Sequence, residues 1–335
     1  MNIKSLLLGS AAALAAVSGA QAADAIVAAE PEPVEYVRVC DAFGTGYFYI
    51  PGTETCLKIG GFIRVQTNFA PNASGTSDWD SFSRAYISFD AKSDTEYGTL
   101  TGFFAAEFNG DFDGGIAGTG DSIIDLDEAY IQIGGLKTGF FYSWWDKGIN
   151  GETDDLSTNS EFNSLAYIYD GGSFQAGVSV DELEGASSTT RPNNIGVAGI
   201  VSASLGGVSF DLLGGYDTDR EEGAVRALLS ADVASFGTFQ LAGVYASGVN
   251  AYYSDAEWTV AGSFAIKATD KLTITPAAQY WSDVAFVNGV DQWRAGLTVD
   301  YKITDGLKTK LTVNYTDNDR TGDVTTGFIR LQRDF

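Results

Sequence analysis

Residues 295–315 read AGLTVDYKITDGLKTKLTVNY, and apolar and polar side chains alternate on both sides of the segment 303–306. The apolar members of this alternation are Ala295, Leu297, Val299, Leu311, Val313 and Tyr315. A period of two places successive side chains on opposite faces of a β-strand. The pair Asp305-Gly306 suits a tight turn, because glycine accepts a positive φ. The stretch therefore predicts a β-hairpin with one apolar and one polar face.

The same alternation continues through residues 57–335, in about sixteen segments of strand length. The lengths of the connections between these segments alternate as well. The short connections are 93–97, 134–135, 170–172, 205–207, 234–237, 268–270 and 303–306. The long connections are 70–81, 109–125, 145–162, 182–193, 217–222, 247–254, 283–289 and 318–323. Short turns at one end and long loops at the other are typical of an up-and-down antiparallel outer-membrane barrel.

Two further observations favour a closed barrel in a membrane. The segments have the length of about 9 to 11 residues that a tilted strand needs to cross the apolar slab, and closure leaves no strand edge unpaired in lipid. Aromatic residues gather near the segment ends, as interfacial girdles do. The predicted fold is thus all-β: a 16-stranded antiparallel transmembrane β-barrel over residues 57–335, with short periplasmic turns and long extracellular loops.

The composition excludes several classes of function. The chain has 335 residues, no histidine, 44 acidic and 20 basic side chains, and a formal net charge of -24. Without imidazole, Ser-His-Asp catalysis and His-ligated zinc are ruled out. The negative charge repels phosphate backbones, so no nucleic-acid partner is expected. We expect no enzymatic activity, no catalytic residue, no bound metal and no cofactor.

The N-terminus carries an export signal. Lys4 precedes an apolar stretch over residues 6–17, and Ala20-Gln21-Ala22 is a small-x-small cleavage site, which predicts a signal peptide over residues 1–22. Residues 23–56 then form an N-terminal periplasmic segment. Its Cys40 and Cys56 are the only cysteines of the chain, and in an oxidising compartment such a pair is expected to form a disulfide.

The cysteine segment also resembles a known family. The run VEYVRVC at 34–40, continued by GYFYIPGTETCL at 46–57 and GGFIR at 60–64, is similar to the N-terminal hallmark of the alphaproteobacterial porins. The resemblance covers the whole chain, and it implies a homotrimeric outer-membrane porin that passes small hydrophilic solutes. Contacts with outer-membrane lipid and lipopolysaccharide are implied too. The end of the chain, FIRLQRDF at 328–335, resembles the signal for the barrel-assembly machinery, with Phe335 as its last residue.

The longest connection, 145–162, occupies the position of the loop that narrows the pore in porins generally. We predict that its Glu152, Asp154 and Asp155 form an acidic edge. Opposite this edge we place the lumen-facing cations, which come from the first, second and last strands and become neighbours on closure. They are Arg64, Arg84 and Arg330.

Two alternatives stay open at the level of sequence. The loop acids would be merely solvated if the arginines paired with inward carboxylates such as Glu107 and Glu128. The other alternative is a secreted β-sandwich, either a carbohydrate-binding protein or a glycosidase. Paired carboxylates can carry out acid–base catalysis without histidine. The steadily apolar face of the strands favours the porin. The net charge predicts a mild preference for cations.

Overall fold

A computed structural model describes residues 37–111, 124–186 and 191–335. Apart from one short 3-10 helix, η1 (Trp144–Asp146), the regular elements of these residues are strands. The strands are β1 (Phe48–Tyr49), β2 (Cys56–Phe69), β3 (Trp79–Thr95), β4 (Gly98–Gly110), β5 (Ile124–Ile133), β6 (Leu136–Tyr142), β7 (Glu161–Asp170), β8 (Phe174–Glu182), β9 (Ile195–Leu205), β10 (Val208–Asp217), β11 (Glu222–Val233), β12 (Gly237–Ala246), β13 (Ala256–Lys267), β14 (Leu272–Val284), β15 (Gln292–Thr304), β16 (Leu307–Asn318) and β17 (Gly322–Asp334). No helix among the described residues is long and apolar enough to cross a membrane.

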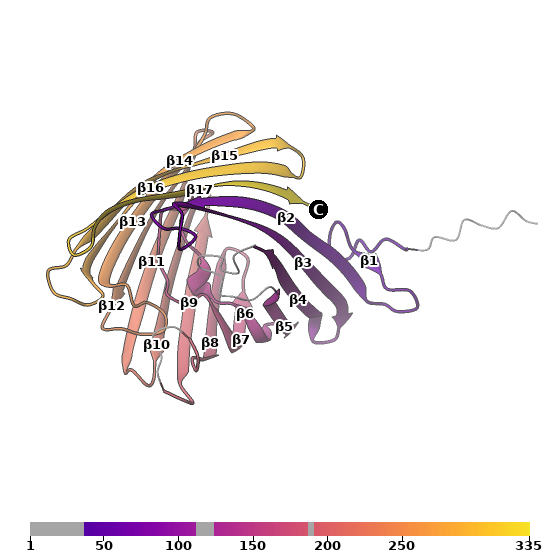
Figure 1. Ribbon diagram of the computed structural model, residues 1–335. Coiled ribbons are helices and arrows are strands. Elements are labelled where there is room, and N and C mark those ends of the chain that lie inside the picture. The colour runs from indigo at the N-terminus through magenta and orange to yellow at the C-terminus, as the bar shows by residue number, and fades with distance from the viewer. Residues whose placement is uncertain (1–36, 112–123, 187–190) are drawn as a thin grey trace, which may run out of the picture. The chain divides into compact units, whose positions relative to one another are not determined.

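The sixteen strands β2 to β17 form one closed antiparallel ring. Each strand pairs with the next along the chain, and β17 pairs with β2 (Figure 1). The predicted sixteen-stranded barrel is therefore confirmed. A β-sandwich is excluded, because it consists of two separate sheets with open edges, whereas this sheet returns to its own first strand.

The last residue takes part in the closure of this ring. The backbone amide of Phe335 donates to the carbonyl of Gly61 at 3.0 Å, and the amide of Gly61 donates back to the carbonyl of Phe335 at 3.2 Å. Four residues earlier, Leu331 pairs with Val65 in the same ladder. The chain thus uses its final residue to pair its first and last long strands.

The alternation in the sequence becomes an outward apolar face and an inward polar face. Ile63 and Val65 on β2 are about half exposed, at 53% and 49%, whereas Gln66 is buried. Exposed aromatic side chains form two belts. At the long-loop end lie Phe69, Trp79, Phe108, Tyr216, Tyr245, Trp258, Trp293 and Tyr315, and at the short-turn end lie Tyr97, Tyr167, Tyr169, Phe174, Phe236 and Tyr301. Two such belts flanking an apolar band are typical of a barrel that spans a bilayer.

The turns follow the predicted pattern. In the hairpin between β15 and β16, Thr304 pairs with Leu307, so Asp305 and Gly306 alone form the turn. Gly306 has a φ of 69°, a backbone conformation that residues with a Cβ atom rarely adopt. The register of this ladder shifts between Lys302 and Thr304, next to the turn.

The N-terminal segment is attached to the short-turn end of β2 and β3. Cys40 and Cys56 form the expected disulfide, with Cα atoms 6.0 Å apart, and both cysteines are buried. Between them, the hydroxyl of Tyr47 donates to the carboxylate of Asp90 at 2.5 Å, and Lys58 and Lys92 lie over the Tyr47 ring. The predicted signal peptide, residues 1–22, lies outside the described residues.

Candidate functional site

The long connection between β6 and β7, residues 143–160, folds into the barrel. Ser143 caps the short helix η1 at its start and accepts a hydrogen bond from the amide of Trp145 at 3.2 Å. The guanidinium of Arg226, on β11 and only 1% exposed, then donates to the carbonyls of Trp144, Trp145 and Leu156 at 2.7, 2.8 and 3.4 Å. One buried arginine therefore holds both the entry and the exit of the loop.

Further contacts fix the loop along the inner wall from β10 to β15. Lys147 pairs with Asp211 of β10 at 2.5 Å. On β14, the amide side chain of Gln279 both accepts from the backbone of Asp155 at 2.7 Å and donates to its carbonyl at 2.8 Å. Arg294 of β15 donates to the carbonyl of Thr153 at 3.1 Å. Because these partners lie on β10, β14 and β15, the loop is held along the inner wall and does not extend into solvent.

The tip of the loop reaches the strands that close the barrel. The carboxylate of Glu152 lies 2.5 Å from the ammonium of Lys310 on β16 and 3.9 Å from the guanidinium of Arg330 on β17. The side-chain amide of Asn314 donates to the carbonyl of Glu152 at 2.8 Å, which fixes the backbone of the tip. One acidic group is thus presented to a basic wall.

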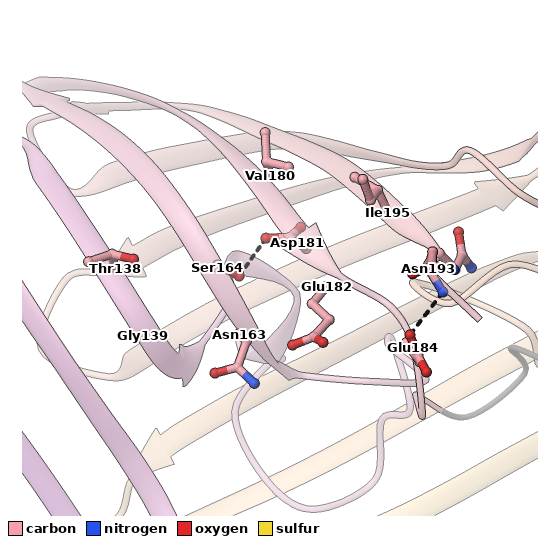
Figure 2. A pocket seen from close by; sticks show the side chains of 11 residues that line it. Thr138, Gly139, Asn163, Ser164, Val180, Asp181, Glu182, Glu184, Asn193 and Ile195 are labelled. Carbon is pink, nitrogen blue, oxygen red and sulfur yellow. Dashed lines mark hydrogen bonds between the residues drawn. The ribbon is translucent and has the colours of Figure 1, made fainter. Parts of the chain in front are cut away.

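A second connection, residues 247–255 between β12 and β13, also folds inward. Tyr252 is fully buried, and its hydroxyl donates to the carboxylate of Asp181 on β8 at 2.7 Å. The same carboxylate accepts from the hydroxyl of Ser164 on β7 at 2.6 Å, which Figure 2 shows as a dashed line. A side chain on Gly196 or Gly215 would overlap Tyr252, so these two glycines make room for the ring.

The two inward loops are joined to each other. The amide of Thr158 donates to the carbonyl of Tyr252 at 3.0 Å, and the amide of Ser254 donates to the hydroxyl of Thr158 at 2.7 Å. Their side chains share one apolar core with the inner face of β9 to β14. Among its members are Trp145, Leu156, Phe162, Leu183, Leu213, Leu228, Val244, Tyr252, Tyr253 and Trp281. The side of the barrel interior next to β9 to β14 is therefore packed like a soluble protein core.

Three loop carboxylates lie in this packed part of the interior. Burial raises the pKa of Asp154 to about 6, although the backbone amide of Ile149 donates to it. Burial, together with the nearby charge of Asp155, raises the pKa of Asp255 to about 7. Burial also raises the pKa of Asp155, and Arg294 opposes that rise. Asp154 and Asp255 therefore have pKa values close to neutral pH.

The structure brings together four of the six residues predicted for the constriction. Arg64 and Arg84 are direct cross-strand partners on β2 and β3, and Arg330 faces them from β17. Glu152 joins them at the loop tip, where it lines the same cavity. Asp154 and Asp155 make other contacts: Asp154 binds the backbone of its own loop, and Asp155 lies against Gln279.

The alternative pairing of the arginines is found for one of them. Arg84 forms an ion pair with Glu107 at 2.7 Å, and its Nε atom donates to Asn109 at 2.8 Å. Glu128 instead accepts from the backbone amide of Tyr142 at 3.4 Å.

Two cavities meet at the arginines. The larger, of about 460 Å³, is lined by the arginines and Glu152, by the amides Gln66, Asn68 and Asn314, and by Phe82 and Phe328. The smaller, of about 200 Å³, is lined by Arg64, Asp300, Lys308, Lys310, Arg330 and Gln332. Since both include Arg64 and Arg330, the two guanidinium groups stand between them.

A further cavity, of about 540 Å³, lies near the long-loop ends of β7 to β9. Asn163, Glu182 and Glu184 are among its lining residues, and the carboxylate of Glu184 accepts from the backbone amide of Asn193 at 2.9 Å (Figure 2). Val180 and Ile195, which also line it, belong to the outward apolar face. This cavity is therefore separate from the one between Glu152 and the arginines.

Three functional residues were missed in the sequence: Lys310, Arg226 and Tyr252. Both cations stand on the polar side of the strand alternation, which identifies them as inward-facing but not as contacts of a loop. Tyr252 stands in the polar connection 247–254, where two adjacent tyrosines are the one available signal that the loop is buried.

A closed antiparallel barrel with an inward loop and a charged lumen defines a channel of the porin class. Comparison with known sequences gives the family. The profile of a porin subfamily matches residues 24–330, and the chain belongs to this subfamily.

Three proteins of similar sequence agree with this assignment. A putative outer membrane protein of Sinorhizobium fredii is 65% identical over 100% of this chain and 99% of its own length. Outer membrane protein IIIA of Rhizobium leguminosarum is 50% identical over 98% of this chain and 93% of its own. The porin Omp2a of Brucella suis is 35% identical over the full length of both chains. The protein is thus an outer-membrane porin.

Solved structures with low sequence identity share the fold. The outer membrane channel DcaP of Acinetobacter baumannii superposes with a TM-score of 0.67 at 14% identity, over 86% of this chain and 99% of the other. A mutant of the porin from Rh. blastica gives a TM-score of 0.59 at 16% identity, over 83% and 100%.

Proposed function

We propose that the protein forms a passive, water-filled diffusion channel for small hydrophilic solutes and ions, and that the loop 145–162 narrows it. The observation that carries the proposal is the course of this loop, which is held along the inner wall from Lys147 on Asp211 to Glu152 on Lys310. With one side of the interior packed by the two loops, solutes pass along the side that stays open. Their path runs past Glu152 and the cations Arg64, Arg84 and Arg330, which line one cavity.

Opposed charges across this path would orient water and dipolar solutes. Such a field stabilises a dipolar solute in the path. An apolar solute gains no such stabilisation, so hydrophilic solutes are favoured. Glu152 is the acidic member in this proposal, whereas Asp154 and Asp155 act by fixing the loop.

For small ions we propose a mild preference for cations. The support is the formal net charge of -24, which attracts cations to the protein and repels anions. A reversal potential measured under a salt gradient tests the sign, and an anion-selective reversal potential would contradict it.

We further propose a homotrimer in the outer membrane, with the short turns in the periplasm and the long loops outside. The two aromatic belts support contact with outer-membrane lipid and lipopolysaccharide. Phe335 is proposed to present the chain to the barrel-assembly machinery, and residues 1–22 to direct export. No catalysis is part of this function.

Conductance in planar bilayers tests the proposal as a whole. The wild-type protein should give stable conductance steps, and Glu152→Gln should change the step size or the ion selectivity. The matched variant Asp78→Asn, in the exposed connection 70–78, should leave both unchanged. A purified, folded barrel that does not conduct would refute the channel, and unchanged steps in Glu152→Gln would refute the role of Glu152.

A further inference from the structure

The basic wall of the path holds more positive charge than its own carboxylates balance. Arg64 and Arg84 stand directly opposite each other in the ladder of β2 and β3, an arrangement in which like charges destabilise a sheet. Arg330 adds a third guanidinium beside them. A fold does not need this repulsion for its stability, which suggests that the charges serve a ligand.

The contacts of the three arginines leave donors free for such a ligand. The Nε atom of Arg64 donates to Gln332 at 2.9 Å, and the Nε atom of Arg330 donates to Gln66 at 2.6 Å, so neutral amides orient both side chains. Within the described part of the chain, no carboxylate lies within 4 Å of the Arg64 guanidinium. The outer nitrogen atoms of Arg64 are therefore available to an anion.

Two further observations support an anion site. The side chain of Arg84 is only 10% exposed, and its Nη2 atom has no hydrogen-bond partner among the described residues. Its positive charge is thus compensated on one side only, by Glu107. Two carboxylates of the protein lie at this place: Glu152 is drawn to Lys310 and lies 3.9 Å from Arg330, and Asp300 lies 3.6 Å from Lys310.

We propose that Arg64, Arg84 and Arg330 form a binding subsite for the carboxylate group of small organic acids on their way through the pore. The inference rests on the proposed channel function and names a solute class for it. Arg64 and Arg330 bind the carboxylate, since a guanidinium presents two parallel donors that match a carboxylate. Arg84, the largely buried cross-strand partner of Arg64, contributes further positive charge to the subsite.

The surroundings fit a solute of a few carbon atoms. The larger of the two cavities beside Arg64 and Arg330 offers amide groups to a second polar group of the solute, namely Gln66, Asn68 and Asn314. Glu152 competes with the solute for the same cations, which keeps binding weak enough for release. The net negative charge of the protein still acts on small ions, so a mild cation preference and a carboxylate subsite are compatible.

Malonate is a suitable probe, because its uncharged analogue malonamide has a similar size. Malonate is added to one side of a bilayer holding the reconstituted full-length protein, at constant ionic strength, while single-channel current is recorded. We expect brief interruptions whose frequency rises with malonate concentration, and none with malonamide. Arg64→Gln should raise the malonate concentration needed for half of the effect by about tenfold, the loss of one charge-assisted contact.

Three variants make the test specific. Arg330→Gln repeats the test on another strand, in case one substitution disturbs the barrel. Arg64→Lys keeps the charge but loses the planar fork, and an intermediate loss is expected. Lys137→Gln removes an inward-facing cation of β6 that does not line either of the two cavities, and its response to malonate should equal that of the wild type.

The outcomes separate this inference from the channel itself. If the wild type conducts but malonate acts no more strongly than malonamide, the subsite is refuted and the channel stands. The same holds if Arg64→Gln and Arg330→Gln both respond like the wild type, or if inorganic phosphate interrupts the current and malonate does not. A wild-type barrel that does not conduct refutes both.

Discussion

The hydroxyl of Tyr252 donates to the carboxylate of Asp181 at 2.7 Å, and this contact joins the loop between β12 and β13 to β8, four strands away from β12 in the ring. Both residues are fully buried. Because the carbonyl of Tyr252 also accepts from the backbone amide of Thr158, the contact helps to fix the position of the inward loop 143–160. The pore is therefore held by two loops.

Tyr252→Phe removes this hydroxyl and leaves the carboxylate of Asp181 with Ser164 as its remaining side-chain donor. We expect a loss of about 1 to 3 kcal/mol in the free energy of unfolding, the cost of an unsatisfied buried group. The looser loop should also make the open-channel current noisier. The measurements are the temperature at which the folded band is lost in detergent gels and the current noise in bilayers.

The adjacent Tyr253 supplies the control for this prediction. It is equally buried, and its hydroxyl has no hydrogen-bond partner among the described residues. Tyr253→Phe should therefore differ little from the wild type in both measurements. Equal effects of the two variants would show that ring packing, and not the bond to Asp181, holds the loop.

Arg226→Met should release the inward loop 143–160 from the barrel wall. The carbonyls of Trp144, Trp145 and Leu156 would each lose a buried donor, at a cost of several times the ~1 kcal/mol of a typical hydrogen bond. We expect a larger conductance and faster entry of sugars in a liposome-swelling assay. Arg191→Met, which removes an exposed ion pair with Asp219, is the control and should change neither. A smaller conductance in Arg226→Met would contradict the prediction.

The stability of the barrel should fall as the pH rises through the range 4 to 7. Asp154 has a folded-state pKa of about 6, above its ordinary value of 3.8, so the folded state binds more protons than the unfolded chain in between. Ionisation then costs on the order of 3 kcal/mol at most. Asp255, with a pKa of about 7, extends the effect to higher pH.

Neutral variants test this assignment. In Asp154→Asn the loss of stability between pH 4 and 6 should become smaller, and in the double variant with Asp255→Asn the loss up to pH 7 should become smaller again, with Asp155 left to contribute. Asp270→Asn, at an exposed short turn, should keep the wild-type dependence. A midpoint that rises with pH in the wild type would show that the sign is wrong.

Loss of the disulfide should affect stability and leave the conductance steps in place. Cys40→Ser together with Cys56→Ser opens a loop of 16 positions, whose closure is worth about 3 kcal/mol in the unfolded state. The inward loop 143–160 makes its contacts on β10 to β17, away from the disulfide. A thermal midpoint that stays the same with and without reductant would contradict the expected stabilisation.

The strand order and both kinds of connection could be predicted from the sequence because each depends on local features. Alternation over residues 295–315 sets the faces of two strands, and Asp305-Gly306 sets their turn. The meeting of Arg64, Arg84 and Arg330 followed from closure alone, since it brings the first two strands beside the last.

The fate of the three loop acids could not be predicted in this way. Whether Glu152 or Asp155 faces the arginines depends on the course of an irregular loop, and this is decided by distant partners such as Arg226 and Gln279. The role of each glycine could not be assigned from the sequence for the same reason. Gly306 serves a turn, whereas Gly215 makes room for a ring that lies 37 positions later in the chain.

The pairing of Gly61 with Phe335 constrains the order of events during folding. Every hairpin of the barrel joins neighbouring segments, but the seam between β2 and β17 joins residues from the two ends of the barrel. Contacts of such large sequence separation form late, because the chain between them must first be ordered. Until β17 has been synthesised, the edge of β2 that it covers stays unpaired. A variant that lacked residues 333–335 would lose the pairs of Arg333 and Asp334 and the backbone bonds of Phe335, so this end of the seam would stay open.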